Sequence, residues 1–495
     1  MPITDSNLEG MFTFETGATP SAEKPPFHVL FLGNWSGGAA RTDLDSRRPV
    51  MIDRDNFDSV MERLGVALEL NIGGGAISLK FREIEDFGPD NLFRKLPVFA
   101  ELRDVRKRLN SSDTFDEAAS EVRSWFKSEE KETVAVPEPV AEAPKYSLED
   151  ILSGAQARRA EETDLSRLIS AVVEPYLVKF DEHEQSKLVA GVDSAISNLM
   201  RSILHHPAFR TLEAAWRGLF FAVRRIETDV DLKLFILELS KDEISDNLKN
   251  ANSLAETVLY REVIRERLEM PGADPFTLIC ADYSFGANVD DVATLMRIGR
   301  IGRAADASFV SQMRPEMFGM ASFEKLPEPS AFVLREETNE AKLWAAVRAV
   351  PESRFLGLCP MRFLARVPYG ADSDPAETFA FEEFADAVPH GEFVWANPSF
   401  VCAVLLAQSY RAYGWDMGDA LIRDIDRLPI YHYVDDGEKK MKPCAESLMT
   451  EAISEKLLEN GLMPLISFKD SDRVRIASYR SAAMPEASLG GRWNK

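Results

Sequence analysis

The sequence predicts a mixed α/β (α+β) fold in two domains joined by a flexible linker, each domain with a mixed β-sheet flanked by helices. Apolar runs suited to buried strands alternate with helical patterns along the chain. At 495 residues the chain exceeds one typical domain. Residues 127–146 combine charge and proline with few large apolar side chains, so they can bury too little surface to offset chain entropy. We therefore expect domains at 1–126 and 163–495, the linker at 127–146, and a short amphipathic helix at 147–162.

The first segment alternates between extended and helical patterns. The run FHVLFLG (27–33) is apolar and ends at a glycine, as a central buried strand does. Over 54–65, apolar residues recur at helical spacing before a terminal glycine. Residues 66–81 predict two strands joined at a triple glycine. A basic helix is expected over 89–109.

The second segment continues the alternation, which indicates α/β layering. Apolar residues at helical intervals predict helices, and continuous apolar runs predict buried strands. The expected helices are 164–180, 185–206 and 288–307, and the expected strands are 231–240, 276–285 and 307–313. The segment at 353–360 continues the alternation.

The charge balance argues against some classes of partner. With 58 basic and 81 acidic residues, the chain carries a net charge of -23, which phosphate surfaces repel. We therefore expect no nucleic-acid binding, although two local basic patches stay open. They are Arg47, Arg48 and Arg54, and Arg94, Lys95, Arg103, Arg106, Lys107 and Arg108.

The chain also lacks the sequence features of membrane and secreted proteins. No apolar run reaches the roughly 18 residues that span a bilayer, and the first residues lack a basic start and an apolar core. The four cysteines form no C-x-x-C pair and sit among apolar or mixed neighbours. We expect buried free thiols and a cytoplasmic protein without membrane insertion.

No motif of catalysis, cofactor binding or metal binding is present. Adjacent residues such as His205 and His206 point about 100° apart on a helix, so their rings converge poorly on one ion, and a cap at the helix terminus is the better interpretation. No G-x-G-x-x-G, G-x-S-x-G or H-E-x-x-H pattern occurs. We expect no enzyme and no cofactor. An enzyme would need a deep pocket in which titratable residues converge.

One stretch of the second segment carries a more specific signal than its helix or strand propensity. ILHHPAFRTLEAAWRGLFFAV (203–223) resembles the segment that identifies the large subunit of the type VI secretion contractile sheath, the TssC/VipB/EvpB family. Similar blocks follow, among them DYSFG (282–286) and SRFLGLCPMRFLARVPYG (353–370), and the resemblance continues to GLMPLISFKDSD (461–472). The residues that carry the first block are His206, Pro207, Phe209, Leu212, Glu213, Trp216, Arg217, Gly218 and Leu219.

The first segment resembles the small sheath subunit, the TssB/VipA family. RRPVMIDRDNFDSVMERLGVAL (47–68) is similar to its N-F-x-x-V helix block, and LKFREIEDFGPDNLFRKLPVFAELRDVRKRL (79–109) to its D-F-x-P-D signature. The residues that carry the motif are Asn56, Phe57, Asp86, Phe87, Pro89 and Asp90.

The two resemblances imply a fusion of sheath subunits in one chain. A structural protein is then expected, which assembles with other sheath subunits around an Hcp tube and contracts to drive the tube outward. The baseplate and a ClpV-type disassembly ATPase are further implied partners. Family large subunits continue past the block that ends here at Asp472 into a tube-facing region, most of which is absent from this chain. The alternative is therefore a sheath-like accessory protein that caps, seeds or limits the sheath.

Several residues have two possible roles under this resemblance. Phe209, Leu212, Trp216 and Leu219 are expected to pack either in the core or between subunits. Met11, Phe12, Thr13 and Phe14 form either a strand exchanged between subunits or a frayed terminus. Leu148, Ile151 and Leu152 lie on one face of the 147–162 helix, which either docks the ATPase or is only structural.

Overall fold

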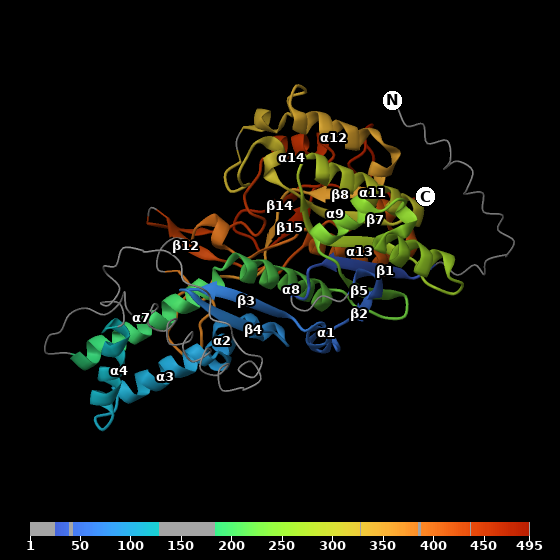
Figure 1. Cartoon of the computed structure of the whole chain (residues 1–495). Helices are drawn as coiled ribbons and strands as arrows, with labels where there is room; N and C mark the ends of the chain where they lie inside the picture. The colour runs from blue at the N-terminus through green and yellow to red at the C-terminus, as the bar shows by residue number, and fades with distance from the viewer. Residues whose placement is uncertain are drawn as a thin grey trace, which may run out of the picture.

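The computed structural model in Figure 1 describes residues 25–38, 43–127, 184–326, 328–384, 388–435 and 437–494. Its strands are β1 (Phe27–Gly33), β2 (Val50–Ile52), β3 (Ala67–Ile72), β4 (Gly75–Lys80), β5 (Leu232–Glu238), β6 (Phe276–Phe285), β7 (Ser308–Met313), β8 (Leu356–Cys359), β9 (Phe363–Leu364), β10 (Trp395–Ala396), β11 (Asp424–Ile425), β12 (His432–Asp435), β13 (Glu438–Met441), β14 (Leu465–Ser467) and β15 (Val474–Ile476).

The helices surround and extend these sheets. They are α1 (Phe57–Leu64), α2 (Pro89–Lys95), α3 (Pro97–Leu109), α4 (Phe115–Lys127), α7 (Glu184–Leu204), α8 (Pro207–Arg225), α9 (Lys241–Asn250), α10 (Val258–Tyr260), α11 (Val289–Ala305), α12 (Asn339–Ala349), α13 (Ser399–Tyr413) and α14 (Glu451–Glu459), with a π-helical turn η5 (Arg261–Glu269). Figure 1 shows α3, α4 and α7 side by side at one end of the molecule, where they pack on one another.

The main sheet has six strands in the order β2-β5-β1-β6-β7-β8. β1, β5, β6, β7 and β8 run parallel, and β2 pairs antiparallel with β5 at the edge. The mixed α/β class predicted from the sequence is confirmed. Parallel strands need cover on both faces, which explains why their sequences read as continuous apolar runs.

The sheet is shared between the two segments of the chain. β1 lies between β5 and β6, with Phe27 opposite Leu232 on one side and Val29 opposite Leu278 on the other. All seven residues of β1 are buried. Figure 1 shows the blue strands β1 and β2 beside β5, which comes far later in the chain. The sequence predicted strands at β1, β5 and β6 but not their pairing across segments.

Different elements pack on the two faces of β1. Phe27 and Phe31 stack on Tyr410 and Phe400 of α13, with ring centroids 4.9 and 5.7 Å apart. His28 points to the opposite face because successive side chains of a strand alternate. Its ring lies 5.2 Å from that of Phe235, next to η5.

The β3–β4 hairpin confirms the expected strand pair at 66–81. Its turn glycines Gly73 and Gly74 have φ values of 58° and 79°. Two successive positive φ values belong to a type I′ turn, which glycine adopts without steric cost. The hairpin packs on α7 and α8, so it too joins the two segments.

The expected helix over 89–109 is two helices. α2 ends at Lys95, Leu96 is extended with ψ of 131°, and α3 begins at Pro97. Proline cannot donate a backbone hydrogen bond, and it disfavours helical geometry in the residue before it. The prediction of one continuous helix was therefore wrong, and the proline alone could have corrected it.

We expect His28 to make stability fall below neutral pH. Burial lowers the pKa of His28 from 6.5 to about 4, while Asp274 raises it and Arg267 and Lys233 lower it. The unfolded chain therefore binds the proton more tightly, and stability falls as the pH drops from 6.5 towards 4, by about 2.5 kcal/mol at pH 4.5. Urea unfolding at pH 7 and 4.5 measures this loss.

His28→Leu should remove this part of the pH dependence, whereas His432→Asn, at an exposed position, should retain it. An unchanged pH dependence in His28→Leu would contradict the assignment.

Candidate functional site

The motif residues of the second segment lie together on α8. His206 is the N-cap, and its Nδ1 accepts a hydrogen bond from the Ala208 amide at 3.3 Å. Pro207 occupies the first turn, where a missing amide proton costs nothing. The expected cap role of the histidine pair is thus confirmed for His206. From this start, α8 crosses between the first segment and α13.

Trp216 joins the two segments directly. Its side chain is fully buried, and its indole Nε1–H donates to the carbonyl of Trp35 at 2.9 Å. The rings of Trp35 and Phe57 stand edge-on to it, each with centroids 5.6 Å away. Phe57, from the small-subunit motif, therefore packs on the tryptophan of the large-subunit motif.

A second aromatic contact lies near the start of α8. Phe209 is fully buried against Phe81 and Phe87, with ring centroids 5.9 and 5.7 Å away in edge-on geometry. Phe81 and Phe87 stack on each other at 4.2 Å. Such pairs add to the gain from burial alone. Leu212 and Leu219, also buried, extend the same helix face.

Gly218 permits α8 and α13 to approach closely. A Cβ atom on Gly218 would lie 2.4 Å from the ring of Phe400. No side chain fits at that distance without movement of the ring. The requirement for glycine here is steric.

Glu213 anchors a buried ionic network beneath α8. Arg366 holds it with two hydrogen bonds of 2.7 and 3.2 Å, and Arg217 adds a third of 2.7 Å. Arg366 also binds Glu383 at 2.7 and 3.1 Å, and Arg217 donates to the hydroxyl of Tyr369 at 2.9 Å. Burial raises the pKa of Glu383, but Arg366 opposes this and lowers it to about 2. Two carboxylates and two guanidinium groups thus neutralise one another.

The small-subunit motif supplies polar contacts as well. Asp86 accepts from the Arg82 amide at 2.9 Å and from Asn91 at 3.2 Å, and it also binds Lys95. Asn56 is the residue that caps α1 by position, and its Oδ1 accepts from the Asp53 amide. Pro89 starts α2.

Asp90 connects the small-subunit motif to the second segment. It accepts hydrogen bonds from the amides of Glu377 and Thr378 at 3.1 and 2.8 Å, and from the Thr378 hydroxyl at 2.6 Å. Burial raises the pKa of Asp90, and the hydrogen bonds of Thr378 outweigh it, so the pKa is lowered. The carboxylate form is the one that holds this contact.

The other two sets of predicted residues cannot be placed. Met11, Phe12, Thr13 and Phe14 lie outside the described residues, and so do Leu148, Ile151 and Leu152 with their helix at 147–162. Their roles stay predictions. The linker at 127–146 also stays a prediction.

Sequence reasoning missed the partners of the motif residues. Trp35, Phe81, Phe400, Arg366 and Glu383 complete the packing and the ionic network. Arg366 stands inside the block at 353–370, but nothing in its own spacing marks it as the partner of Glu213, which lies far earlier in the chain.

Most residues of the two basic patches form ion pairs with acidic side chains. Arg47 is buried and binds Glu243 at 3.0 Å, so it presents no surface charge. In the second patch Lys95 binds Asp86, Arg106 binds Asp193, and Arg108 binds Asp104 and Glu121. These contacts neutralise much of the positive charge that the sequence suggested.

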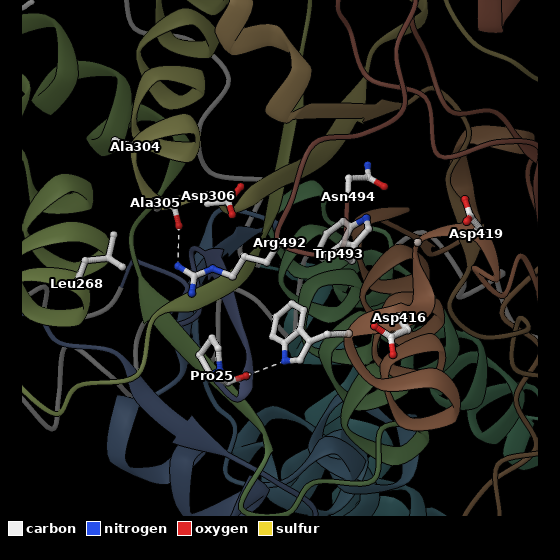
Figure 2. Close-up of a pocket in the computed structure, with 12 residues that line it drawn as sticks. Pro25, Leu268, Ala304, Ala305, Asp306, Asp416, Asp419, Arg492, Trp493 and Asn494 are labelled. Carbon is white, nitrogen blue, oxygen red and sulfur yellow. Dashed lines mark hydrogen bonds between the residues drawn. The ribbon is translucent and has the colours of Figure 1, made fainter. Parts of the chain in front are cut away.

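A cavity of about 600 Å³ lies where the start and the end of the described chain meet (Figure 2). Trp415 donates to the carbonyl of Pro25 at 2.9 Å, and Arg492 donates to that of Ala305 at 2.8 Å. Its carboxylates belong to Asp306, Asp416 and Asp419. Figure 2 shows Asp306 apart from Asp416 and Asp419, so the three do not converge on one point.

All four cysteines are buried and free, as expected. The sulfur atoms of Cys359 and Cys402 lie 3.5 Å apart. Among the residues that the structure describes, no cluster of His, Cys, Asp or Glu is arranged to hold a metal ion. The same residues include no helix with the length and apolar character needed to cross a bilayer.

Comparison with known families decides what this arrangement belongs to. Residues 186–483 match the VipB family, described as "EvpB/VC_A0108, tail sheath N-terminal domain", and this range covers most of the chain. The chain belongs to the type VI secretion sheath family. Residues 11–128 match a second family, described as "Type VI secretion system, VipA, VC_A0107 or Hcp2". The chain is therefore a fusion of a VipA-type segment and a VipB-type segment.

A curated relative supports the assignment. The type VI secretion system sheath protein TssC1 of Pseudomonas aeruginosa is 32% identical over 338 residues, which cover 67% of this chain and 68% of TssC1. The contacts of Trp216, Phe209 and Asp90 thus join a VipA-type segment to a VipB-type segment.

Gly218→Ala tests the steric requirement on α8. Alanine in place of glycine normally favours a helix by about 1 kcal/mol. Here we expect a net loss of about 1–3 kcal/mol in the free energy of unfolding, because the new methyl group overpacks against Phe400. Urea denaturation measures it.

Gly391→Ala is the control for this variant, since its Cβ would meet no atom within 4 Å. Phe400→Leu combined with Gly218→Ala should recover part of the loss. Equal stability of both single variants would exclude the steric explanation.

Arg366→Met tests the ionic network. Removal of one partner leaves Glu213 and Glu383 without their main counter-charge in the interior, so we expect a loss of about 3–5 kcal/mol by urea denaturation. Arg303→Met is the matched control, because it breaks an ion pair of a half-exposed arginine and should cost at most about 1 kcal/mol. Similar losses in both variants would show that the network contributes no more than a surface pair.

Proposed function

We propose that this chain is a structural component of a type VI secretion contractile sheath, which assembles around an Hcp tube and contracts to drive it outward. One observation carries the proposal. β1 of the VipA-type segment lies inside the sheet of the VipB-type segment, so one polypeptide supplies both halves of the unit.

The contacts between the segments support a stable unit. Backbone pairing on both sides of β1 is reinforced by buried aromatic packing around Trp216 and by the hydrogen bonds of Asp90. Buried apolar residues from both segments form one continuous core. A unit of this kind can transmit force without separation of its halves, as a contractile sheath requires.

The role is structural rather than catalytic under this proposal. The buried charged groups around Glu213 are already paired with one another, so they serve packing and not acid–base chemistry. The protein acts in the cytoplasm, where sheaths assemble. Its partners are other sheath subunits, the Hcp tube, the baseplate and a ClpV-type ATPase. Residues 11–14 are the candidates for strand exchange, and Leu148, Ile151 and Leu152 for ATPase docking.

Negative-stain electron microscopy with light scattering tests the proposal on the purified full chain, alone and with the other subunits of the system. We expect long tubules, in which each repeat contains one chain. Hcp should promote their formation, because the tube templates the sheath.

The opposite outcome is a monodisperse monomer or dimer that binds only to the ends of sheaths made by other subunits. That result would replace the proposal with the accessory role, in which the chain caps, seeds or limits the sheath.

A further inference from the structure

A polar cavity beyond the carboxyl ends of the parallel strands has no part in the contacts described so far. Its volume is about 320 Å³, within the range of small-molecule sites. It lies between the start of α8, the ends of β6 and β7, and residues 391–397. Ligands of open α/β sheets bind at this edge. Asp282, from the DYSFG block, and Gln312 are among the residues that line it.

Asp282 presents a carboxylate to the cavity without a counter-charge. β6 runs past the end of β1, whose last pair on this side is Leu32 with Ala281, so Asp282 is the first residue beyond the shared ladder. Its side chain makes no hydrogen bond or ion pair within the described ranges of the chain. Burial raises the pKa of Asp282 to about 7. The Asp282 side chain is only partly buried, so its carboxylate is open to the cavity and to a ligand of opposite charge.

Gln312 is a second, independent sign of a ligand. It is 9% exposed and lies on β7 opposite Ser284, two residues along from Asp282. No hydrogen bond of its side-chain amide is found among the described residues. Buried polar groups in proteins are nearly always hydrogen-bonded. A ligand in the cavity would supply the missing partner, because Gln312 lines it.

The cationic side chains of the cavity are already engaged. Arg362 binds Glu446 at 2.6 Å, and Arg210 lies 2.9 Å from Glu392. The N-terminus of α8, which also borders the cavity, begins with Pro207 and is capped by His206. These pairs leave Asp282 as the one charge of the cavity lining that no described group balances.

We propose that this cavity binds a cationic group, a guanidinium or an alkylammonium, with the Asp282 carboxylate as its counter-ion and the Gln312 side-chain carbonyl as a second acceptor. The cation comes either from a free basic amino acid or amine, or from a lysine or arginine side chain of a second protein chain. The site is separate from the contacts that join the two segments, so it does not depend on the proposed sheath function.

Isothermal titration of the purified full chain with N-acetyl-arginine amide tests the small-molecule source. Binding should saturate, and Asp282→Asn should weaken it at least tenfold. N-acetyl-citrulline amide, which replaces the guanidinium with a neutral urea of similar shape, should not bind. Asp246→Asn, at an exposed position, is the matched control and should bind as the wild type does.

The pH dependence adds a readout that a purely structural role would not give. Asp282 loses its charge as the pH falls through about 7, so affinity should drop about tenfold from pH 8 to pH 6. The other charged side chains that line the cavity belong to Arg210 and Arg362, and arginine side chains in general do not titrate near neutral pH. Asp282→Asn should show no such dependence.

Sedimentation velocity on the same variants tests whether the cation comes from a second protein chain. Self-association that is lost in Asp282→Asn, retained in Asp246→Asn and competed by N-acetyl-arginine amide would assign the cation to a second chain. Either result supports the site. The inference is overturned if neither binding nor association depends on Asp282, or if Asp282→Asn lowers the melting temperature, as loss of an internally paired carboxylate would.

Discussion

The structure depends on one backbone arrangement, the insertion of β1 between β5 and β6. β1 is buried along its whole length, and its amides and carbonyls find partners in strands of the other segment on both sides. If β1 were buried without those pairings, its polar backbone groups would lack partners, which costs more than the hydrogen bonds gain. The side-chain contacts of α8 with Trp35, just after β1, and with Phe57 add a second connection between the segments.

The packing of α8 within the second segment contains charge as well as apolar surface. The network of Glu213, Arg366 and Glu383 is fully paired, so its desolvation cost is offset by hydrogen bonds of good geometry. Apolar packing tolerates small displacements of one helix over another, whereas bidentate ion pairs do not. We interpret the network as a device that specifies how α8 sits on the segment at 363–383, in addition to the affinity that Trp216 and Phe209 supply.

Periodicity and apolar runs predicted most strands of the main sheet and several of the helices. Helices such as α1, α7 and α11, and strands such as β1, β5 and β6, lie where local patterns indicated them. The shared sheet could not be predicted in this way, because an apolar run looks the same whichever strand it pairs with. Of the site, sequence motifs identified Trp216 and Phe57 but not their contact. Partners such as Arg366 depend on the fold and have no local signal.

The position of β1 also has a consequence for synthesis of the chain. Its partner strand β5 begins roughly 200 residues later. At translation rates of about 5–20 residues per second, β1 leaves the ribosome about 10–40 s before any strand can cover it. During that interval an apolar strand with both edges open is exposed to other nascent chains, a situation that favours aggregation. Cells that make this protein must therefore delay or shield the first segment, and a chaperone that binds extended apolar peptides would serve that need.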